Sequence, residues 1–251
     1  MTQYGFYFDQ GRCNDCQVCA AICKDWNGVP AGPAKWVRMY KWEEGTWPQL
    51  SKYTLFAPCY HCENPVCVDA AKGAVYKEPK YGAVLIDPLK ATSGALRDAW
   101  EACPYGAIVF DSDASDATAS KCTMCVDRLE QGLKPVCVLS CPMRALDFGP
   151  LDDMKQKYGN VRDMHALPSS TTTQPAVIFK PREAVARKQL VPYDTNKALQ
   201  LFAGRGDGLS AKYTSSTDVT QIPSGVVRKD KLVLKAKDSS ELMYYTADED
   251  A

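Results

Sequence analysis

The chain has 251 residues, a length that suits one large domain or two small ones. Its 30 lysine and arginine residues balance 30 aspartate and glutamate residues, so no basic excess is available for phosphate contacts and nucleic-acid binding is disfavoured. No apolar run approaches the roughly 18 residues that span a bilayer, and residues 1–9 contain neither a basic start nor an apolar signal core. We therefore expect no direct membrane span, and a protein that is cytoplasmic or exported with a partner that carries the signal.

The predicted elements up to residue 150 are short and surround groups of cysteines. A strand is expected at 4–9, a helix at 17–26, a hairpin at 73–87 with its turn near Gly82, a helix at 123–131, and at 145–148 a strand that partners the first. Short strands and helices around cysteine groups predict an α+β fold of tandem ferredoxin-like modules that bind [4Fe–4S] clusters.

Residues 151–251 are predicted to be a polar C-terminal extension that wraps a partner. Residues 168–181 suggest an extended arm, 194–204 a short helix, and 231–236 a strand. No cysteine occurs in this extension.

Twelve cysteines lie between positions 13 and 141. Disulfides are disfavoured because the protein is too long to need them, no signal peptide is visible, and the cysteines cluster locally. Two of the groups look like ferredoxin runs. One is C-x2-C-x2-C-x3-C, the bacterial spacing for a [4Fe–4S] cluster, in which the fourth cysteine ligates the other cluster of a pair. The other is C-x2-C-x11-C-x3-C followed by Pro142, and its ending is not a usual zinc spacing.

A third group, C-x2-C-x4-C from Cys59 to Cys67, lacks a fourth ligand, whereas Cys103 stands alone. These fragments complete each other. An internal repeat supports this pairing, because Cys103 opens C-P-Y-G-A-I-V-F and Cys141 opens C-P-M-R-A-L-D-F. A weaker copy, A-A-K-G-A-V-Y, occupies 70–76.

The repeat predicts four sites, of which one is empty. The spacing counted back from Cys103 reaches Ser93, Leu96 and Ala99, and the weak copy places Ala70 or Ala71 where its cysteine would stand. None of these side chains can hold iron as a thiolate does. The twelve cysteines then form three sets of four: a first set of Cys13, Cys16, Cys19 and Cys141; a second set of Cys122, Cys125, Cys137 and Cys23; and a third set of Cys59, Cys62, Cys67 and Cys103.

Three [4Fe–4S] clusters are the cofactors that these sets predict. For the first two, pairing within each contiguous run remains open, but that scheme does not explain the third. The sets also predict the module boundaries. An outer two-cluster module comprises residues 1–51 and 113–150, and an inserted module with one cluster comprises 52–112.

Three other side chains lie next to cysteines in the sequence. His61 is interpreted as a residue beside the ligands that adjusts potential or relays electrons, since the cysteines suffice without it. Lys24 and Lys121 adjoin cysteines, so they either raise cluster potentials by their charge or are simply solvated.

The cysteine motifs resemble those of the iron–sulfur electron-transfer subunits of dimethyl sulfoxide reductase-type molybdopterin oxidoreductases. The family has four cysteine sets, with C-x-H-C-E-N-P-x-C in the second, C-P-Y-G-A closing the third and K-C-T-M-C opening the fourth; this sequence has them at Cys59–Cys67, Cys103–Ala107 and Lys121–Cys125. The resemblance covers about residues 1–180. The loss of one cluster looks most like the three-cluster small subunits of pyrogallol–phloroglucinol transhydroxylase and resorcinol hydroxylase.

This resemblance implies a non-catalytic subunit that passes electrons to or from a large molybdenum- or tungsten-pterin catalytic subunit, which is a transhydroxylase, hydroxylase or reductase with a phenolic compound as one candidate substrate. A membrane anchor or a soluble electron carrier is a further candidate partner. The alternatives are a structural or regulatory zinc–cysteine protein and a stand-alone polyferredoxin. A radical enzyme, which needs a cluster with three protein ligands, fits only if Cys103 does not join the third set.

Overall fold

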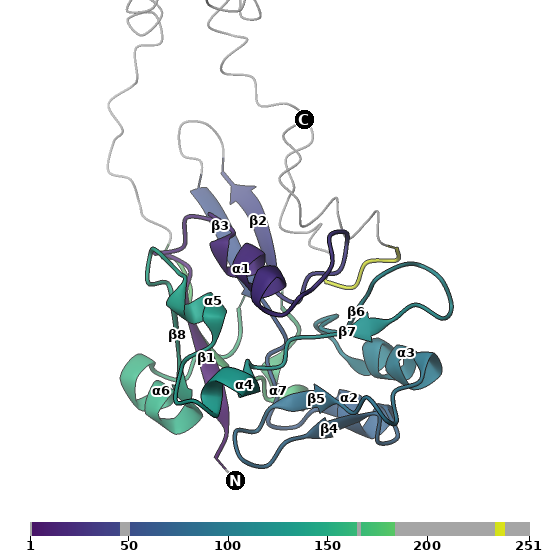
Figure 1. Cartoon of the computed structure of the whole chain (residues 1–251). Helices are drawn as coiled ribbons and strands as arrows, with labels where there is room; N and C mark the ends of the chain where they lie inside the picture. Colours follow the sequence, from purple (N-terminus) through teal and green to yellow (C-terminus); the bar gives the residue numbers. More distant parts are fainter. Residues whose placement is uncertain (1, 46–50, 165–166, 184–233, 239–251) are drawn as a thin grey trace, which may run out of the picture.

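The outer half of the molecule is the part built around the predicted outer module (residues 1–51 and 113–150), and the inner half is the part built around the predicted inserted module (residues 52–112). A three-stranded sheet lies at the centre of the outer half (Figure 1). The computed structural model describes residues 2–45, 51–164, 167–183 and 234–238. Strand β1 (Tyr4–Asp9) is the middle strand; it pairs antiparallel with β8 (Leu146–Pro150) and parallel with β9 (Val177–Lys180). The sheet therefore joins segments from the beginning, middle and later part of the sequence.

Both faces of β1 are buried, which explains why its sequence shows no clear alternation of polar and apolar residues. Phe6 and Phe8 point into the main core, whereas Tyr7 packs on the other face with Leu151 and Met154 of α6 (Leu151–Tyr158). The Tyr7 ring stacks on the Tyr158 ring with centroids 3.7 Å apart. Helix α6 thus covers one face and leaves the other to the cysteine loops.

The inner half contains two small hairpins and two packed helices, on the right of Figure 1. Strands β4 (Val75–Lys77) and β5 (Val84–Ile86) pair antiparallel, and so do β6 (Val109–Phe110) and β7 (Ala119–Ser120). Helix α3 (Ser93–Ala102) begins at Thr92, whose side chain accepts a hydrogen bond from the Ala95 amide, as an N-cap does. It packs against α2 (Val66–Ala70).

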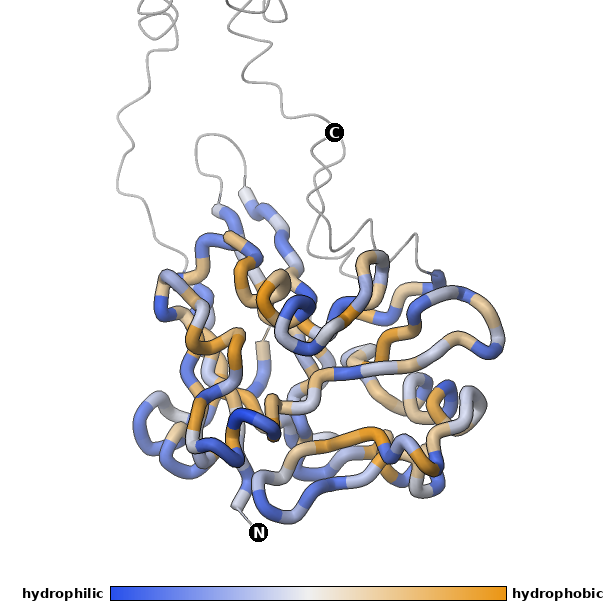
Figure 2. Tube along the Cα trace, viewed as in Figure 1, coloured by the Kyte–Doolittle hydropathy of each residue, from blue (hydrophilic) through white to orange (hydrophobic). Residues whose placement is uncertain are grey.

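The remaining elements hold cysteines or connect the halves. They are α1 (Val18–Trp26), β2 (Arg38–Glu44), β3 (Ser51–Ala57), α4 (Val126–Leu129), α5 (Val136–Leu139) and α7 (Ser170–Thr173). β2 and β3 form a regular antiparallel hairpin. Figure 2 shows hydrophobic segments in both halves rather than in one central layer.

The expected α+β fold is confirmed, as are the strand at 4–9, its partner after residue 145, the helix after Gln17 and the hairpin at 73–87. The helix expected at 123–131 is shorter, because residues 123–125 belong to the cysteine loop.

The extended arm expected at 168–181 is wrong in part. Its first residues form α7, and β9 joins the central sheet because the apolar run Val177–Phe179 is fully buried there. The ordered outer half therefore continues past residue 150. The helix expected at 194–204 lies outside the described residues, as does the first half of the strand at 231–236; residues 234–236 are not in a strand.

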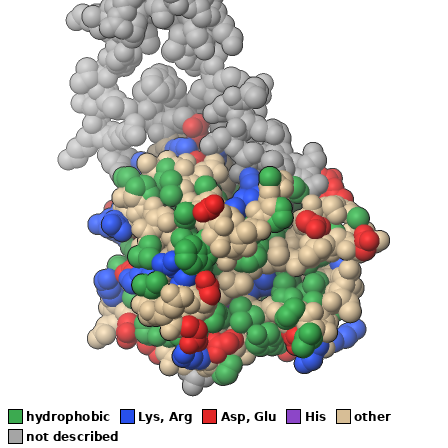
Figure 3. Space-filling model, in the orientation of Figure 1, with side chains coloured by type: hydrophobic (Ala, Val, Ile, Leu, Met, Phe, Trp, Pro, Cys, Tyr) green, Lys and Arg blue, Asp and Glu red, His purple; other side chains and the backbone are tan. Residues whose placement is uncertain are grey.

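Charged side chains of both signs are interspersed over the face shown in Figure 3, in agreement with the balanced composition. Among the described residues, no helix has both the length and the apolar character needed to cross a membrane.

Candidate metal centre

The first C-x2-C loop of each of the three cysteine runs bends at the same position. The residue just before the second cysteine has a left-handed backbone in all three loops: Asp15 (φ 62°), His61 (φ 44°) and Met124 (φ 61°). This conformation is uncommon for residues other than glycine, and it concentrates at binding sites, where successive backbone N–H groups turn toward an anion. The three loops thus share one local geometry.

The first set of thiols surrounds a cavity. Cys13, Cys16, Cys19 and Cys141 all line one small cavity between the loop before α1 and the turn before β8. Burial, followed by the neighbouring Cys13 and Cys141 thiols, raises the pKa of Cys19 to about 12. Burial likewise raises the pKa of Cys13, and Cys141 adds to that effect. Cys141 therefore faces the run at 13–19, although it is distant in sequence.

The second set gathers at the other end of α1. Helix α1 packs against α5, which carries Cys137. Burial and then the Cys125 thiol raise the pKa of Cys23 to about 12. Burial also raises the pKa of Cys137, with further increases from Cys122, Cys125 and Cys23. Cys23, four residues after Cys19 on the same helix, therefore lies near the cysteines between positions 122 and 137.

The third set joins the loop before α2 to the residue that follows α3. Burial, then Cys59 and Cys103, raise the pKa of Cys67 to about 12. The same three causes raise the pKa of Cys62. Cys103 itself is buried at the end of α3, near the Cys62 and Cys67 thiols.

The three sets lie in a row with the second set in the middle. Cys19 of the first set contributes to the raised pKa of Cys137, and Cys59 of the third contributes to that of Cys122, in each case after the larger effect of burial. Thiols that are distant in sequence therefore lie near one another: Cys141 lies near Cys13 and Cys19, Cys23 near Cys122 and Cys137, and Cys103 near Cys62 and Cys67.

The chemistry of the donors suits an iron–sulfur cluster. Within the described residues, no three histidine, cysteine or acidic side chains are arranged to hold a single metal ion. A tetrahedral zinc site would need four sulfurs about 2.3 Å from one point. Four thiolates are the usual ligands of a [4Fe–4S] cluster.

Hydrogen-bond donors lie against several of the sulfurs. The amide of Met124 donates to Cys122 Sγ at 3.4 Å, and the amide of Ala145 donates to Cys141 Sγ at 3.3 Å. The Asn27 side-chain amide is 3.6 Å from Cys23 Sγ. Such bonds to ligand sulfurs stabilise their negative charge and raise reduction potentials.

His61 links the third set to the second. It is fully buried between Cys59 and Cys62, and its Nδ1 accepts a hydrogen bond of 2.9 Å from the Val84 amide. The proton of the neutral ring therefore sits on Nε2, which lies 3.5 Å from Cys122 Sγ. Burial, and secondarily Lys121 and Lys77, lowers the pKa of His61 well below its usual value, so the ring is neutral.

Two cations near the cysteines donate hydrogen bonds to backbone carbonyls. Lys121 is buried, and its ammonium donates to the carbonyl oxygens of Val84 and Cys122. Lys24 donates to the carbonyls of Gly32 and Ala34, each at 3.0 Å. Another buried cation, Arg38, was missed by the sequence reasoning, because an arginine at the start of a strand carries no signal of its position near a cysteine 65 residues away.

The fold and the thiol sets define a ferredoxin-like iron–sulfur protein. The 4Fe-4S dicluster domain family matches residues 51–151. An anaerobic dimethyl sulfoxide reductase component from Escherichia coli is 36% identical over 188 residues, which cover 72% of this sequence and 89% of that protein. A component of the sulfite dehydrogenase of Allochromatium vinosum is 34% identical, with 72% and 84% covered. A component of formate dehydrogenase 2 from Nitratidesulfovibrio vulgaris is 33% identical, with 59% and 77% covered.

This protein belongs to the iron–sulfur electron-transfer subunits of the dimethyl sulfoxide reductase family of molybdopterin oxidoreductases.

Proposed function

We propose that this protein carries three [4Fe–4S] clusters, one in each thiol set, and passes electrons to or from a molybdenum- or tungsten-pterin catalytic subunit. The observation that supports the proposal is that thiols distant in sequence lie near one another, Cys141 beside Cys19, Cys23 beside Cys137 and Cys103 beside Cys67. A [4Fe–4S] cluster, when bound, exchanges one electron at a time. Because each would have four thiolate ligands, no iron is left open for substrate, and the chemistry falls to the partner.

The place of a fourth cluster is filled by aliphatic side chains, which supports a count of three. The segment that should supply three ligands is the regular helix α3, and two of its candidate positions, Leu96 and Ala99, are buried in an apolar core. Ala71 of the facing segment is in the same core, together with Val75 and Ile108. Methyl groups in contact leave neither ligands nor room for iron.

The weak repeat at 70–76 retains the backbone geometry of its cysteine-containing copies. Three residues after Cys103 and Cys141 stand Gly106 (φ 58°) and Arg144 (φ 51°), and three residues after Ala70 stands Gly73 (φ 94°). The left-handed turn is therefore present where the thiol is not. This match favours Ala70 as the counterpart of the lost cysteine.

The arrangement of the protein's own groups suits an electron carrier. The thiols of the second set are buried, His61 joins the third set to the second, and backbone amides donate to sulfurs of the first and second. These groups would hold the metal centres in fixed positions, so that little reorganisation accompanies a change of charge.

The partner is inferred from relatives. The proteins matched are components of a dimethyl sulfoxide reductase, a sulfite dehydrogenase and a formate dehydrogenase. The three-set pattern resembles that of the transhydroxylase and hydroxylase small subunits, so we propose a catalytic partner of that kind, acting on a phenolic substrate.

Anaerobic purification of the native complex tests this proposal. We expect about twelve iron and twelve sulfide per polypeptide, and molybdenum or tungsten in a co-purifying large subunit. About sixteen iron would mean that a fourth site exists, and a colourless zinc protein would refute the electron-transfer role. Assay of the complex with phenolic substrates, dimethyl sulfoxide, sulfite and formate then identifies the reaction.

A further inference from the structure

Arg38, the first residue of β2, is only 2% exposed. Its guanidinium donates to the Tyr40 hydroxyl at 3.2 Å and to the carbonyl oxygens of Leu234 at 2.9 Å and Tyr105 at 2.8 Å. Its Nε has no hydrogen-bond partner among the described residues. These three partners are neutral, and no ion pair within the described part of the molecule includes Arg38.

This situation is costly without a compensating anion. A guanidinium stays protonated in proteins, and a charge removed from water with no opposite charge destabilises the fold. Hydrogen bonds to carbonyl oxygens recover part of that cost. The location of Arg38 indicates where the missing negative charge is.

Arg38 lies beside the third thiol set. In the β2–β3 hairpin it pairs with Ala57, two residues before Cys59. Its bond to the Tyr105 carbonyl ties it to the turn that follows Cys103.

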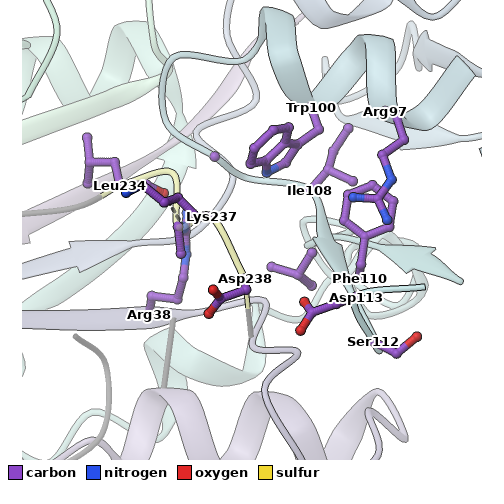
Figure 4. Close-up of a pocket in the computed structure, with 13 residues that line it drawn as sticks. Arg38, Arg97, Trp100, Ile108, Phe110, Ser112, Asp113, Leu234, Lys237 and Asp238 are labelled. Atoms are coloured by element: carbon purple, nitrogen blue, oxygen red, sulfur yellow. Dashed lines mark hydrogen bonds between the residues drawn. The ribbon is translucent and has the colours of Figure 1, made fainter. Parts of the chain in front are cut away.

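A segment of the C-terminal extension closes the other side of Arg38. Figure 4 shows Leu234 beside Arg38, along a groove whose far wall carries Trp100 and Arg97. Gly106 faces this segment so closely that a Cβ there would collide with the Leu234 carbonyl oxygen. The Lys235 ammonium lies 4.6 Å from the Trp100 ring centroid and donates to the Glu101 carbonyl. The segment thus keeps water from the guanidinium, and its charge is weakly screened.

We propose that Arg38 is the counter-charge of the third thiol set and raises the reduction potential of the cluster held there, an inference that rests on the three-cluster function proposed above. A cluster with four thiolate ligands carries net negative charge, and net charge is one of the properties that set its potential. Reduction adds a further negative charge. A fixed positive charge beside the set therefore favours the reduced form.

Redox titration of the intact complex, followed by electron paramagnetic resonance, tests the inference in three variants. Arg38→Gln removes the charge, and Arg38→Lys keeps it with fewer hydrogen bonds. Arg97→Gln is the control, because it removes a charge from the same groove. The Arg97 guanidinium stacks on the Phe110 ring, 4.0 Å from its centroid, instead of facing the third set. The third-set signal is the one that Cys103→Ser abolishes or alters.

We expect Arg38→Gln to lower the ratio of reduced to oxidised third-set cluster at least tenfold at a fixed potential, a shift of about 59 mV for one electron. Arg38→Lys should restore most of the loss, and Arg97→Gln should leave the potential unchanged. The shift should be equal at pH 6.5 and 8.5, because a guanidinium does not titrate there.

An Arg38→Gln complex with all twelve iron and an unchanged third-set potential would overturn the inference. The inference would also be overturned if the third-set potential in Arg38→Lys were as low as in Arg38→Gln. The potential would then depend on the hydrogen bonds of Arg38 and not on its charge. If the Arg38→Gln complex loses the third cluster, the Arg38→Lys complex provides the test. A third-set potential near that of the parent complex supports the inference, and a lowered third-set potential refutes it. A parent complex with only eight iron would instead refute the three-cluster function.

Discussion

The outer and inner halves contain the same cysteine–proline unit, at Cys141 and at Cys103. Each unit turns through a left-handed residue three positions later and then enters a short strand, β8 or β6. In the outer half the unit supports two thiol sets under a three-stranded sheet. In the inner half it supports one thiol set, and an aliphatic core takes the place of the other.

On the three-cluster function proposed above, this difference would show how a metal-binding fold can lose a metal. Where thiols remain, metal ligation couples to folding and needs little hydrocarbon. Where they are lost, the space must be filled at the density of a protein interior. The capped helix α3 and its contact with α2 do this by burying small and branched side chains.

The largest expected effect comes from removing Cys103, the fourth ligand of the third set. Cys103→Ser should lower the iron content from about twelve to about eight per polypeptide and destabilise residues 52–112, because one thiolate of four is lost. Iron analysis and hydrogen exchange measure both effects. Ser93→Cys is the matched control and should leave iron at about twelve, since Ser93 lies on a helix and not in a ligand loop. Unchanged iron in Cys103→Ser would contradict the pairing.

The aliphatic core of the inner half should respond to truncation without any change in iron. Leu96→Ala shortens a buried side chain, and we expect a loss of about 2–5 kcal/mol in the opening free energy of the inner half. Hydrogen exchange of amides in α2 and α3 measures it, while those of β1 and β8 should be unaffected. Leu89→Ala is the control, because that leucine in the same half is 94% exposed. Equal effects at both positions would argue against a packed core.

His61 tests the link between the halves. His61→Phe removes the Nε2 donor to Cys122, and we expect the potential of the second-set cluster to fall by the equivalent of about 1 kcal/mol, the value of one hydrogen bond. Potentiometric titration measures it. If only the potential of the third-set cluster falls, the hydrogen bond from His61 to Cys122 does not affect the potential of the second-set cluster.

The smallest effect is expected in the outer sheet. Burial acts to raise the pKa of Asp147, but hydrogen bonds from Lys134, Tyr158 and Lys157 outweigh it and lower that pKa. A lowered carboxyl pKa stabilises the fold above the unfolded value of about 3.9, and the stabilisation is lost only as the pH falls through the folded pKa. Asp147→Asn should therefore cost about 1 kcal/mol at pH 7. The difference in Tm between the two proteins should be constant from pH 5.5 to 8; a narrowing in that range would contradict the assignment.

The sequence predicts those features that depend on local spacing. Cysteine intervals and the repeat at Cys103 and Cys141 are sufficient to group thiols, and the element at 4–9 and its partner follow from their position beside cysteine loops. Burial of β9 could not be foreseen, because its strand partner is some 170 residues away and its flanking Ser and Thr residues suggest an arm. Arg38 was missed for a similar reason: its environment is created by residues 105 and 234, and no local pattern marks it.

An iron-edge anomalous diffraction map of the native complex tests the central claim most directly. The account predicts three peaks of four irons, one within each thiol set, and only protein density between Leu96, Ala99 and Ala71. A fourth peak at that place, or a peak at Cys59, Cys62 and Cys67 that lacks Cys103, would contradict it.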